Sequence, residues 1–399
     1  MLLKRALIYK SNIVRAIIIN KNSINIKTTP LKLVVTLIYA IFLVACSTDN
    51  ASWIEDNHEY IDNKKITEIT MPGTHIANAY NVDKDNPKCT GEILPQSYSS
   101  NALIEQELSS ILVNSMPHSD DTFNLFIEEL NTQDVNIAKQ LKTGVRYLDI
   151  RICQQDGEFY TANLYLTDKF DTIAEQITQF LATHPQEIII VDFDNNLRNE
   201  SGYMDGKTIA LFHAYLDKTF GNLIASKDKI SNTIGELKQQ HYQIILLSSN
   251  SELNAYPDIW NKEQITITVD AQSATIKKLS VMEALLSNNT LGIPNKLNIV
   301  PIYSDIDIGE LTTDINNNTE SNNSPDNTIN NYTDDETDQS IILNYLGQNI
   351  GNHPSIIVTD KDFLPTIEYL IIQQEINATF IESTPTNNNP DQIATESAH

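Results

Sequence analysis

Short apolar runs alternate with helix-like segments along most of this 399-residue chain. The apolar runs are rich in Ile, Val and Leu and are bounded by polar turns, a pattern typical of strands buried on both faces of a parallel sheet. The predicted strands are 65–70, 145–152, 158–166, 187–193, 243–247, 264–269, 297–303 and 355–359. The predicted helices are 171–183, 205–220, 232–240, 281–286, 339–348 and 365–376. This order predicts a single α/β barrel of the (β/α) TIM type, spanning 65–378.

A doubly wound open sheet is the alternative fold. No glycine-rich phosphate-binding loop follows any predicted strand, and this favours the barrel. We expect the barrel to be irregular, because a long insertion, 77–133, follows its first strand. The stretch 314–338 is rich in Asn, Thr and acids and has almost no apolar residues, so a disordered loop is predicted before the last helices. The tail, 379–399, has the same character.

The charge balance excludes one class of partner. The chain has 27 Lys and Arg against 52 Asp and Glu, a formal net charge of −25. Such a chain repels a phosphate backbone, so no nucleic acid partner is expected. The three cysteines are too few for a disulfide scaffold or a Cys-rich zinc site, and the histidines show no His-x-x-x-His pair. We therefore expect no metal and no cofactor, and we expect a monomer.

The N-terminal region resembles a bacterial lipoprotein signal. An apolar run, 33–45, follows Lys27 and Lys32 and ends in Leu-Val-Ala-Cys, so 1–45 is predicted to be a signal peptide. Cys46 would be lipidated, and 46–64 would form a polar tether. Ser47, in place of Asp, resembles lipoproteins sent to an outer membrane. The expectation is an exported protein that is lipid-anchored at the bacterial cell envelope; a signal anchor with a chance cysteine is the alternative.

Two segments carry residues suited to chemistry. In the first, Pro72 and Gly73 turn the chain after a predicted strand and present His75 at its C-terminal end, where active sites form in parallel barrels. In the second, Gly144 leads into a strand on which Asp149 and Arg151 share one face. Buried charges are costly unless they are paired or used, so these two form either a structural ion pair or part of a site.

Together these segments resemble the X domain of phosphatidylinositol-specific phospholipase C in its bacterial form. The resemblance rests on Pro72-Gly73-Thr74-His75 and on the run from Gly144 to Arg151. Thr132-Gln133 and the segment from Phe180 to Glu187 support it, and it spans about 60–377. The resemblance implies a barrel that acts on phospholipid in a membrane.

In that family the substrate supplies the nucleophile: the inositol 2-hydroxyl attacks phosphorus, expelling diacylglycerol and leaving a cyclic inositol phosphate. The resemblance implies that His75 is the general base, that Arg151 binds the phosphate, and that Asp360 orients the base. Asp149 would help to hold the site together. Arg151 stands where calcium-binding members carry an acid, which indicates the metal-independent branch.

The sequence departs from the family pattern at two positions of the site. Bacterial members usually carry Asp directly after the first His, and here the residue is Ile76. Their second His, which protonates the leaving group, is replaced by Asn163 or Thr161. Losing a general acid typically lowers the rate by about 10²–10⁴. His118 or Asp192 is a candidate replacement.

Three readings of function stay open. The first is an enzyme of possibly reduced activity, the second is a catalytically impaired lipoprotein that binds lipid or inositol phosphate, and the third is a surface interaction lipoprotein. Asp194 is a candidate for replacing the acid or for binding substrate. Trp260 is placed in a loop, where it would stack on a sugar ring or dip into a membrane interface, with core-edge packing as the alternative.

The remaining cysteines raise the question of a disulfide. Cys89 follows His75 in the loop leaving the first strand, and Cys153 lies two residues beyond Arg151. Neighbouring strands bring both to one rim of the barrel, so an exported chain could join them. The alternative is two free thiols, one buried and one exposed.

Overall fold

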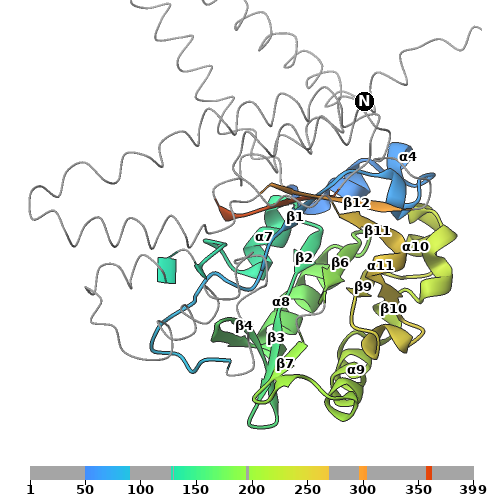
Figure 1. Cartoon of the computed structure of the whole chain (residues 1–399). Coiled ribbons are helices and arrows are strands. Elements are labelled where there is room, and N and C mark those ends of the chain that lie inside the picture. Colours follow the sequence, from blue (N-terminus) through green and yellow to red (C-terminus); the bar gives the residue numbers. More distant parts are fainter. Residues whose placement is uncertain are drawn as a thin grey trace, which may run out of the picture. The chain divides into compact units, whose positions relative to one another are not determined.

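The computed structural model describes residues 50–89, 127–128, 130–194, 197–268, 296–302 and 356–361 (Figure 1). Parallel strands form the main sheet in the order β10-β9-β6-β2-β1-β13-β12-β11. They are β1 (Met71–Thr74), β2 (Tyr147–Asp149), β6 (Ile189–Asp192), β9 (Ile244–Ser248), β10 (Ile259–Asn261), β11 (Thr266–Thr268), β12 (Leu297–Ile302) and β13 (Ile356–Thr359). No pairing joins β10 to β11 within the described residues. The predicted (β/α) barrel is therefore confirmed in an irregular form.

The helices that cover this sheet begin and end at recognisable signals. They are α7 (Ile137–Thr143), α8 (Phe170–Thr183), α9 (Gly206–Phe220), α10 (Ile234–Gln239) and α11 (Lys262–Ile265), with short 3-10 turns η4 (Gly221–Leu223), η5 (Lys227–Ser231) and η6 (Leu253–Ala255). Asn136 caps α7 by accepting from the Lys139 amide, and Gly144 ends it with φ 113°, a value that suits glycine. The predicted helices 171–183, 205–220 and 232–240 are confirmed as α8, α9 and α10.

The first predicted strand, 65–70, is wrong. Its residues form a 3-10 turn, η2 (Ile66–Glu68), and the strand begins only at Met71. Pro72 and Gly73 therefore lie inside β1 instead of turning the chain after it. A Cβ on Gly73 would lie 2.8 Å from Cδ1 of Tyr147, so glycine permits the close approach of β1 and β2.

Beyond Asp149 the chain leaves the barrel and builds a second sheet, which the sequence did not predict. Its order is β5-β4-β3-β7-β8. The strands are β3 (Ile152–Gln155), β4 (Glu158–Asn163), β5 (Tyr165–Lys169), β7 (Leu197–Asn199) and β8 (Gly202–Tyr203). Asp156 and Gly157, both with positive φ, form the two-residue hairpin turn between β3 and β4. In Figure 1 the labels β3, β4 and β7 lie at the lower end of the fold, and α4 lies at the upper end.

The expected tether, 46–64, is wrong for its described part. Asn50–Ser52 (η1), Trp53–Asp56 (α3) and His58–Ile61 (α4) are helical. Trp53, Ile54 and Ile61 are buried in the main core, and Trp53 donates from its indole Nε1 to the Gly144 carbonyl at 2.9 Å. Burial of these apolar side chains makes the segment part of the folded domain.

A buried ion pair lies beneath this segment. Arg146 and Glu187 are fully buried, with Nη2 and Oε2 2.7 Å apart. Arg146 also donates to the carbonyls of Leu141 and Val145, and Glu187 accepts from the Glu55 amide at 2.9 Å. Because every charged atom has partners, the pair can be tolerated away from water.

The predicted bond between Cys89 and Cys153 is present. The two sulfurs pack with Ala162, Leu166 and Tyr160 on the outer face of the second sheet. The bond ties the loop that follows His75 to the strand that follows Arg151.

We expect the double substitution Cys89→Ser/Cys153→Ser to lower the free energy of unfolding. The bond joins residues 64 apart, and the chain-entropy model gives a stabilisation of about 4 kcal/mol for a loop of this size. Urea unfolding of the oxidised protein and of the variant measures the difference. A thiol titration of the unreduced, denatured protein is the control, and reactive thiols at both positions would contradict the bond.

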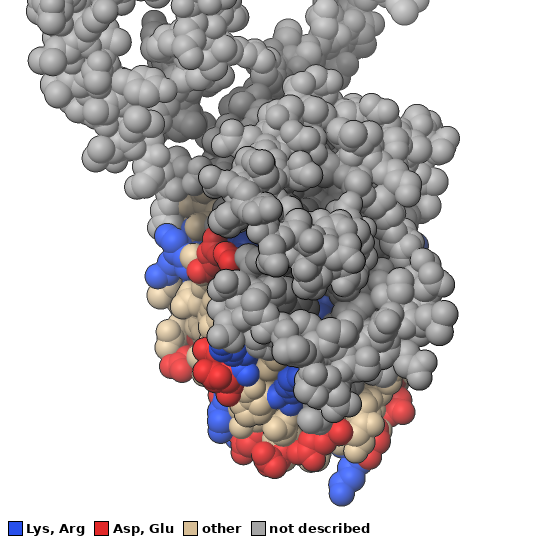
Figure 2. Space-filling view, turned by 60° about the vertical axis from the view of Figure 1, so that its left-hand side comes forward, with Lys and Arg blue, Asp and Glu red and all other residues tan. Residues whose placement is uncertain are grey.

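Several sequence predictions lie outside the described residues. These are the signal peptide, Cys46, His118, most of the insertion 77–133, the loop 314–338, the helices 281–286, 339–348 and 365–376, and the tail 379–399. In the part of the chain that the structure describes, none of the helices has the length and apolar character needed to cross a bilayer. Figure 2 shows acidic side chains gathered along the lower edge of the described surface, in keeping with the net charge of −25.

Candidate active site

His75 and Asp360 meet where two neighbouring strands end. β1 and β13 pair in register with Thr74 opposite Thr359, so the next residue on each strand is His75 or Asp360. The His75 Nδ1 lies 3.0 Å from Oδ1 of Asp360, and both side chains are partly exposed. A carboxylate that accepts the Nδ1 proton leaves the lone pair of the neutral ring on Nε2. The pair therefore has the arrangement of a general base and its orienting carboxylate.

Two neighbouring side chains, Thr132 and Gln133, form hydrogen bonds to the backbone of His75. Thr132 donates its hydroxyl to the carbonyls of His75 and Ile76, at 3.0 and 3.1 Å. Gln133 donates from Nε2 to the His75 carbonyl at 2.9 Å and to the Thr359 carbonyl at 3.2 Å. The Thr-Gln pair noted in the sequence thus fixes the two strand ends that carry the His–Asp pair.

The loop after His75 runs beside the segment that carries Arg151. Asp149 accepts the Ile76 amide on Oδ2 at 3.2 Å, and its carbonyl accepts the Ala77 amide at 2.6 Å. Asn78 accepts the Arg151 amide on Oδ1 at 3.0 Å. These three contacts hold the segment that follows His75 beside the segment that carries Arg151. Asp149 acts here as a positioning residue.

Arg151 is oriented by the residue that stands where a second His was expected. Its Nη1 donates to Oδ1 of Asn163 at 3.0 Å, and Nδ2 of Asn163 donates to the Leu130 carbonyl at 2.6 Å. Both ends of this amide are in use. Asn163 can hold a guanidinium in place, but an amide has no proton of suitable acidity to give to a leaving group.

Thr161, the other candidate for the acid position, is not at the site. It is fully buried, and its hydroxyl bonds to the Thr167 hydroxyl at 2.7 Å and donates to the Asp168 carbonyl at 3.1 Å. Its side chain is thus committed to the β4–β5 hairpin, which argues against Thr161 as the acid position.

An apolar cluster surrounds the acid position. Ile76 packs with Leu130 and Leu164, which are the hydrogen-bonding partner and the chain neighbour of Asn163. Ile76 has φ 39°, in the left-handed region that a β-branched residue rarely adopts and that Asp tolerates better. An apolar side chain has thus taken a backbone position that suits the acid seen in bacterial members of the family.

A second charged group lies at the ends of β6 and β10. Lys262 contacts Oδ2 of Asp192 at 2.7 Å and Oδ1 of Asp194 at 3.1 Å, and Asp194 also accepts from the Ser249 hydroxyl. Tyr147 donates its hydroxyl to Asp192. Asp149 and Asp192 are register neighbours on β2 and β6. Since β2 lies between β6 and β1, Asp149 stands between this charged group and the His75–Asp360 pair along the strand ends.

Burial and the Lys262 charge shift the pKa of Asp192 in opposite directions. Burial raises the pKa of its carboxyl, whereas the Lys262 ammonium opposes that rise. Burial lowers the pKa of Lys262, but the carboxylates of Asp192, Asp194 and Asp149 outweigh it and raise the pKa above its ordinary value. The two groups form an ion pair, so the Asp192 carboxyl is held against Lys262.

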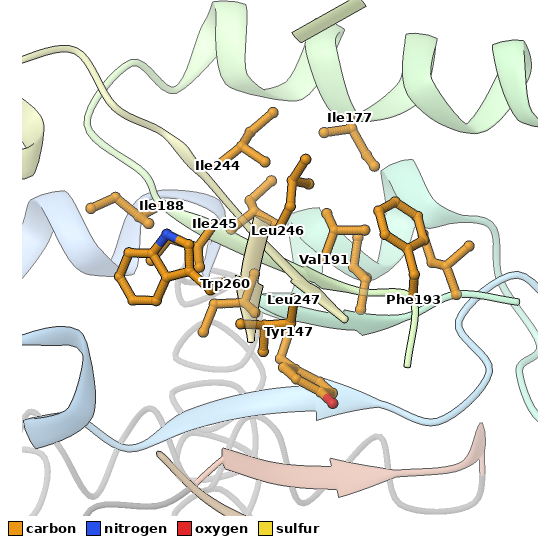
Figure 3. Close-up of a cluster of buried hydrophobic side chains, with 14 of the residues drawn as sticks. Tyr147, Ile177, Ile188, Val191, Phe193, Ile244, Ile245, Leu246, Leu247 and Trp260 are labelled. Carbon is orange, nitrogen blue, oxygen red and sulfur yellow. The ribbon is translucent and has the colours of Figure 1, made fainter. Parts of the chain in front are cut away.

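Trp260 is placed wrongly by the sequence prediction. It lies in strand β10, is only 1% exposed, and donates from Nε1 to the Ala225 carbonyl at 2.8 Å. Figure 3 shows its ring beside Ile188 and Ile245. It can neither stack on a sugar nor enter a membrane, because neighbouring strands and helices cover it.

Sequence reasoning missed Asn78, Gln140 and Lys262. Asn78 and Gln140 are fully buried; Gln140 accepts from the Thr74 hydroxyl and donates to the Ala77 carbonyl. The available signal was a polar amide within an apolar segment, as in Ile76-Ala77-Asn78-Ala79. Within the described residues, no group of three or more His, Cys, Asp or Glu side chains gathers in a way that could hold a metal ion.

The chain was compared with known proteins. No family model matches it. It is 25% identical over 244 residues to PI-PLC X domain-containing protein 2 of Mus musculus, an alignment that covers 60% of this chain and 65% of the mouse protein. It is 30% identical over 133 residues to the 1-phosphatidylinositol phosphodiesterase of Listeria monocytogenes, covering 33% and 40% of the two chains. The chain thus spans just under two thirds of the mouse protein.

Solved structures agree on the fold. A phosphatidylinositol-specific phospholipase C from Staphylococcus aureus superposes with a TM-score of 0.52 at 17% identity, covering 82% of this chain and 98% of that one. At this identity the superposition speaks for the barrel alone. The sequence relatives, together with this barrel, support the resemblance to the phosphatidylinositol-specific phospholipase C X-domain family.

Proposed function

We propose that the protein cleaves an inositol phospholipid into diacylglycerol and a cyclic inositol phosphate. His75 takes the proton of the inositol 2-hydroxyl, whose oxygen then forms a bond to phosphorus while the bond to the diacylglycerol oxygen breaks. Arg151 binds the phosphoryl oxygens and stabilises their growing charge. The observation that supports this proposal is that the segment 75–78, which carries His75, is hydrogen-bonded to the segment 149–151, which carries Arg151.

The leaving alkoxide still needs a proton. The apolar cluster at Ile76 and the committed amide of Asn163 leave water as the donor in this proposal. We therefore propose a slow enzyme, with a rate lower by about 10²–10⁴ than one with a positioned acid. Arg151 is a poor neighbour for a cation, which supports a metal-independent mechanism.

A second candidate function is a protein that binds inositol phospholipid without turnover. The observation that favours it is that Ile76 and Asn163 stand where bacterial members of the family carry an Asp and a second His. The retained His75–Asp360 pair favours the enzyme, because binding alone requires no oriented base.

Phosphorus NMR of the purified protein with phosphatidylinositol vesicles distinguishes the two functions. The enzyme produces a cyclic inositol phosphate signal that grows with time and is absent with His75→Ala. Vesicle binding without any such signal would favour the second candidate. Neither binding nor product would exclude both.

We also propose that the protein is exported and anchored by a lipid on Cys46 at the cell envelope, in an outer membrane. The support is the basic and apolar signal that ends in Leu-Val-Ala-Cys, together with a disulfide, which suits an oxidising compartment. Loss of membrane partitioning in Cys46→Ser tests this.

Restoring the general acid should take two substitutions. Asn163→His alone removes the acceptor for Arg151 and places an imidazole beside apolar side chains, so a small gain or a loss is expected. Ile76→Asp/Asn163→His supplies the imidazole with a carboxylate at a backbone position suited to Asp, and the rate should rise by up to about 10²–10⁴. Initial rates on phosphatidylinositol measure the effect, with Ile76→Asp as the control. No gain in a folded double variant would mean that another group already acts as the acid.

A further inference from the structure

The chain enters the fold at the N-terminal ends of the parallel strands. Asn50 donates from Nδ2 to the Thr143 carbonyl at 3.3 Å, and Trp53 donates to the carbonyl of Gly144, three residues before β2. The Glu55 amide donates to Glu187, two residues before β6. The segment 50–56 is therefore bound by several contacts to this end of the barrel.

The candidate active site lies at the opposite end. His75, Asp360 and Asp149 stand at the C-terminal ends of β1, β13 and β2. All these strands are parallel, so their beginnings and ends lie on opposite faces. Seven residues separate Gly144 from Arg151, and at the rise of a β-strand this corresponds to roughly 20 Å.

The chain between Cys46 and Asn50 is too short to bridge the two faces. Four residues, even fully extended, span at most about 14 Å. A lipid on Cys46 would hold the N-terminal face of the barrel within that distance of the membrane surface. For the active site to reach the same surface, the barrel would have to turn over, which needs a tether longer than the roughly 20 Å between its ends.

We propose that the protein acts in trans: its active site faces away from the membrane that carries its anchor and cleaves inositol phospholipid in a second, facing membrane. The partner is thus a lipid surface other than its own. This inference rests on the proposed function and on lipidation of Cys46.

Vesicles separate the two arrangements. The lipidated full chain is reconstituted either into phosphatidylinositol vesicles that are immobilised apart from one another on a support, or into phosphatidylcholine vesicles mixed with separate phosphatidylinositol vesicles. Cleavage in the second arrangement should be faster by about tenfold or more, because a tether that cannot span the distance gives almost no effective concentration. Equal rates, or faster cleavage within the anchor membrane, would overturn the proposal.

Two matched variants act as controls. An insert of about 30 Gly and Ser residues between Asp49 and Asn50 extends the tether by roughly 30 Å and should restore cleavage within the anchor membrane. Cys46→Ser should cleave both kinds of vesicle alike. Activity in detergent micelles tests the chemistry separately: an inactive protein there refutes the proposed function, whereas an active protein with no preference between membranes refutes only this inference.

Orientation can also be measured without turnover. Glu59 is exposed in α4, and Tyr203 is 54% exposed in β8 of the second sheet. A dye on Glu59→Cys should transfer energy to acceptors in the lipid head groups more efficiently than a dye on Tyr203→Cys. Equal transfer, or the reverse order, would contradict the proposed orientation.

Discussion

Replacing His75 with alanine should lower the rate of phosphatidylinositol cleavage by about 10²–10⁴, the usual contribution of a positioned general base. The inositol hydroxyl would then have to lose its proton to water. Arg151→Ala should lower the rate comparably, because it removes the charge that binds the phosphoryl oxygens. Initial rates from release of water-soluble inositol phosphate measure both effects, and circular dichroism confirms that the variants fold.

His213 provides a matched control. Its Nε2 lies 2.8 Å from Oδ1 of Asp258, and this pair is about as exposed as the His75–Asp360 pair. The His213 ring stacks on Tyr256. Its partner Asp258 directly precedes β10, at the N-terminal end of the strands, whereas His75 and Asp360 follow the C-terminal ends of β1 and β13. His213→Ala should therefore leave the rate unchanged, as should a chelator. Full activity in His75→Ala, or inhibition by a chelator that calcium reverses, would refute the assignment of the base and of Arg151.

Glu187→Gln should lower the free energy of unfolding by about 3–5 kcal/mol, because it leaves the buried Arg146 guanidinium without its counter-charge. The substitution should also weaken the attachment of the N-terminal segment, because Glu187 accepts hydrogen bonds from the amides of Ile54 and Glu55. Urea unfolding followed by tryptophan fluorescence measures the change, and Trp53, which packs in the same region, reports it.

The exposed pair of Lys169 and Glu158 is the control for this prediction. Its atoms are 3.6 Å apart and its side chains are more than half exposed. Glu158→Gln should change stability by less than about 1 kcal/mol, because water screens the pair. A similar small effect for Glu187→Gln would mean that the Arg146 site rearranges or admits water.

The residues at the C-terminal ends of the strands were easier to predict from the sequence than the residue at which the first strand begins. His75, Asp149 and Arg151 were found because polar residues follow apolar runs at strand ends, and Asp360 was found by the resemblance. The first strand was misplaced because Pro and Gly are local turn signals. The packing of Gly73 against Tyr147, which keeps the chain extended there, is a contact between residues 74 apart.

The amides and the lysine of the site could not be predicted, because their partners are distant in the chain. Asn78 contacts Arg151 across 73 residues of chain, and Lys262, which follows β10, contacts Asp192 on β6 with β9 lying between these two strands. Trp260 shows the opposite error. Its polar neighbours in sequence suggested an exposed loop, whereas a strand of three residues places the ring in the core.

The loop joined by the disulfide also covers an edge of the second sheet. Pro87 accepts the Leu166 amide, and Cys89 donates its own amide to the Leu164 carbonyl, so 86–89 lies along the outer side of β5. An uncovered strand edge is a template for pairing with another molecule. Among the described residues, this cover consists of hydrogen bonds, the Lys88 ammonium over the Tyr165 ring and the packing of Cys89 with Ala162 and Leu166, and the disulfide adds a covalent link. Oxidation of Cys89 soon after synthesis would therefore help to keep this strand edge covered and so reduce aggregation.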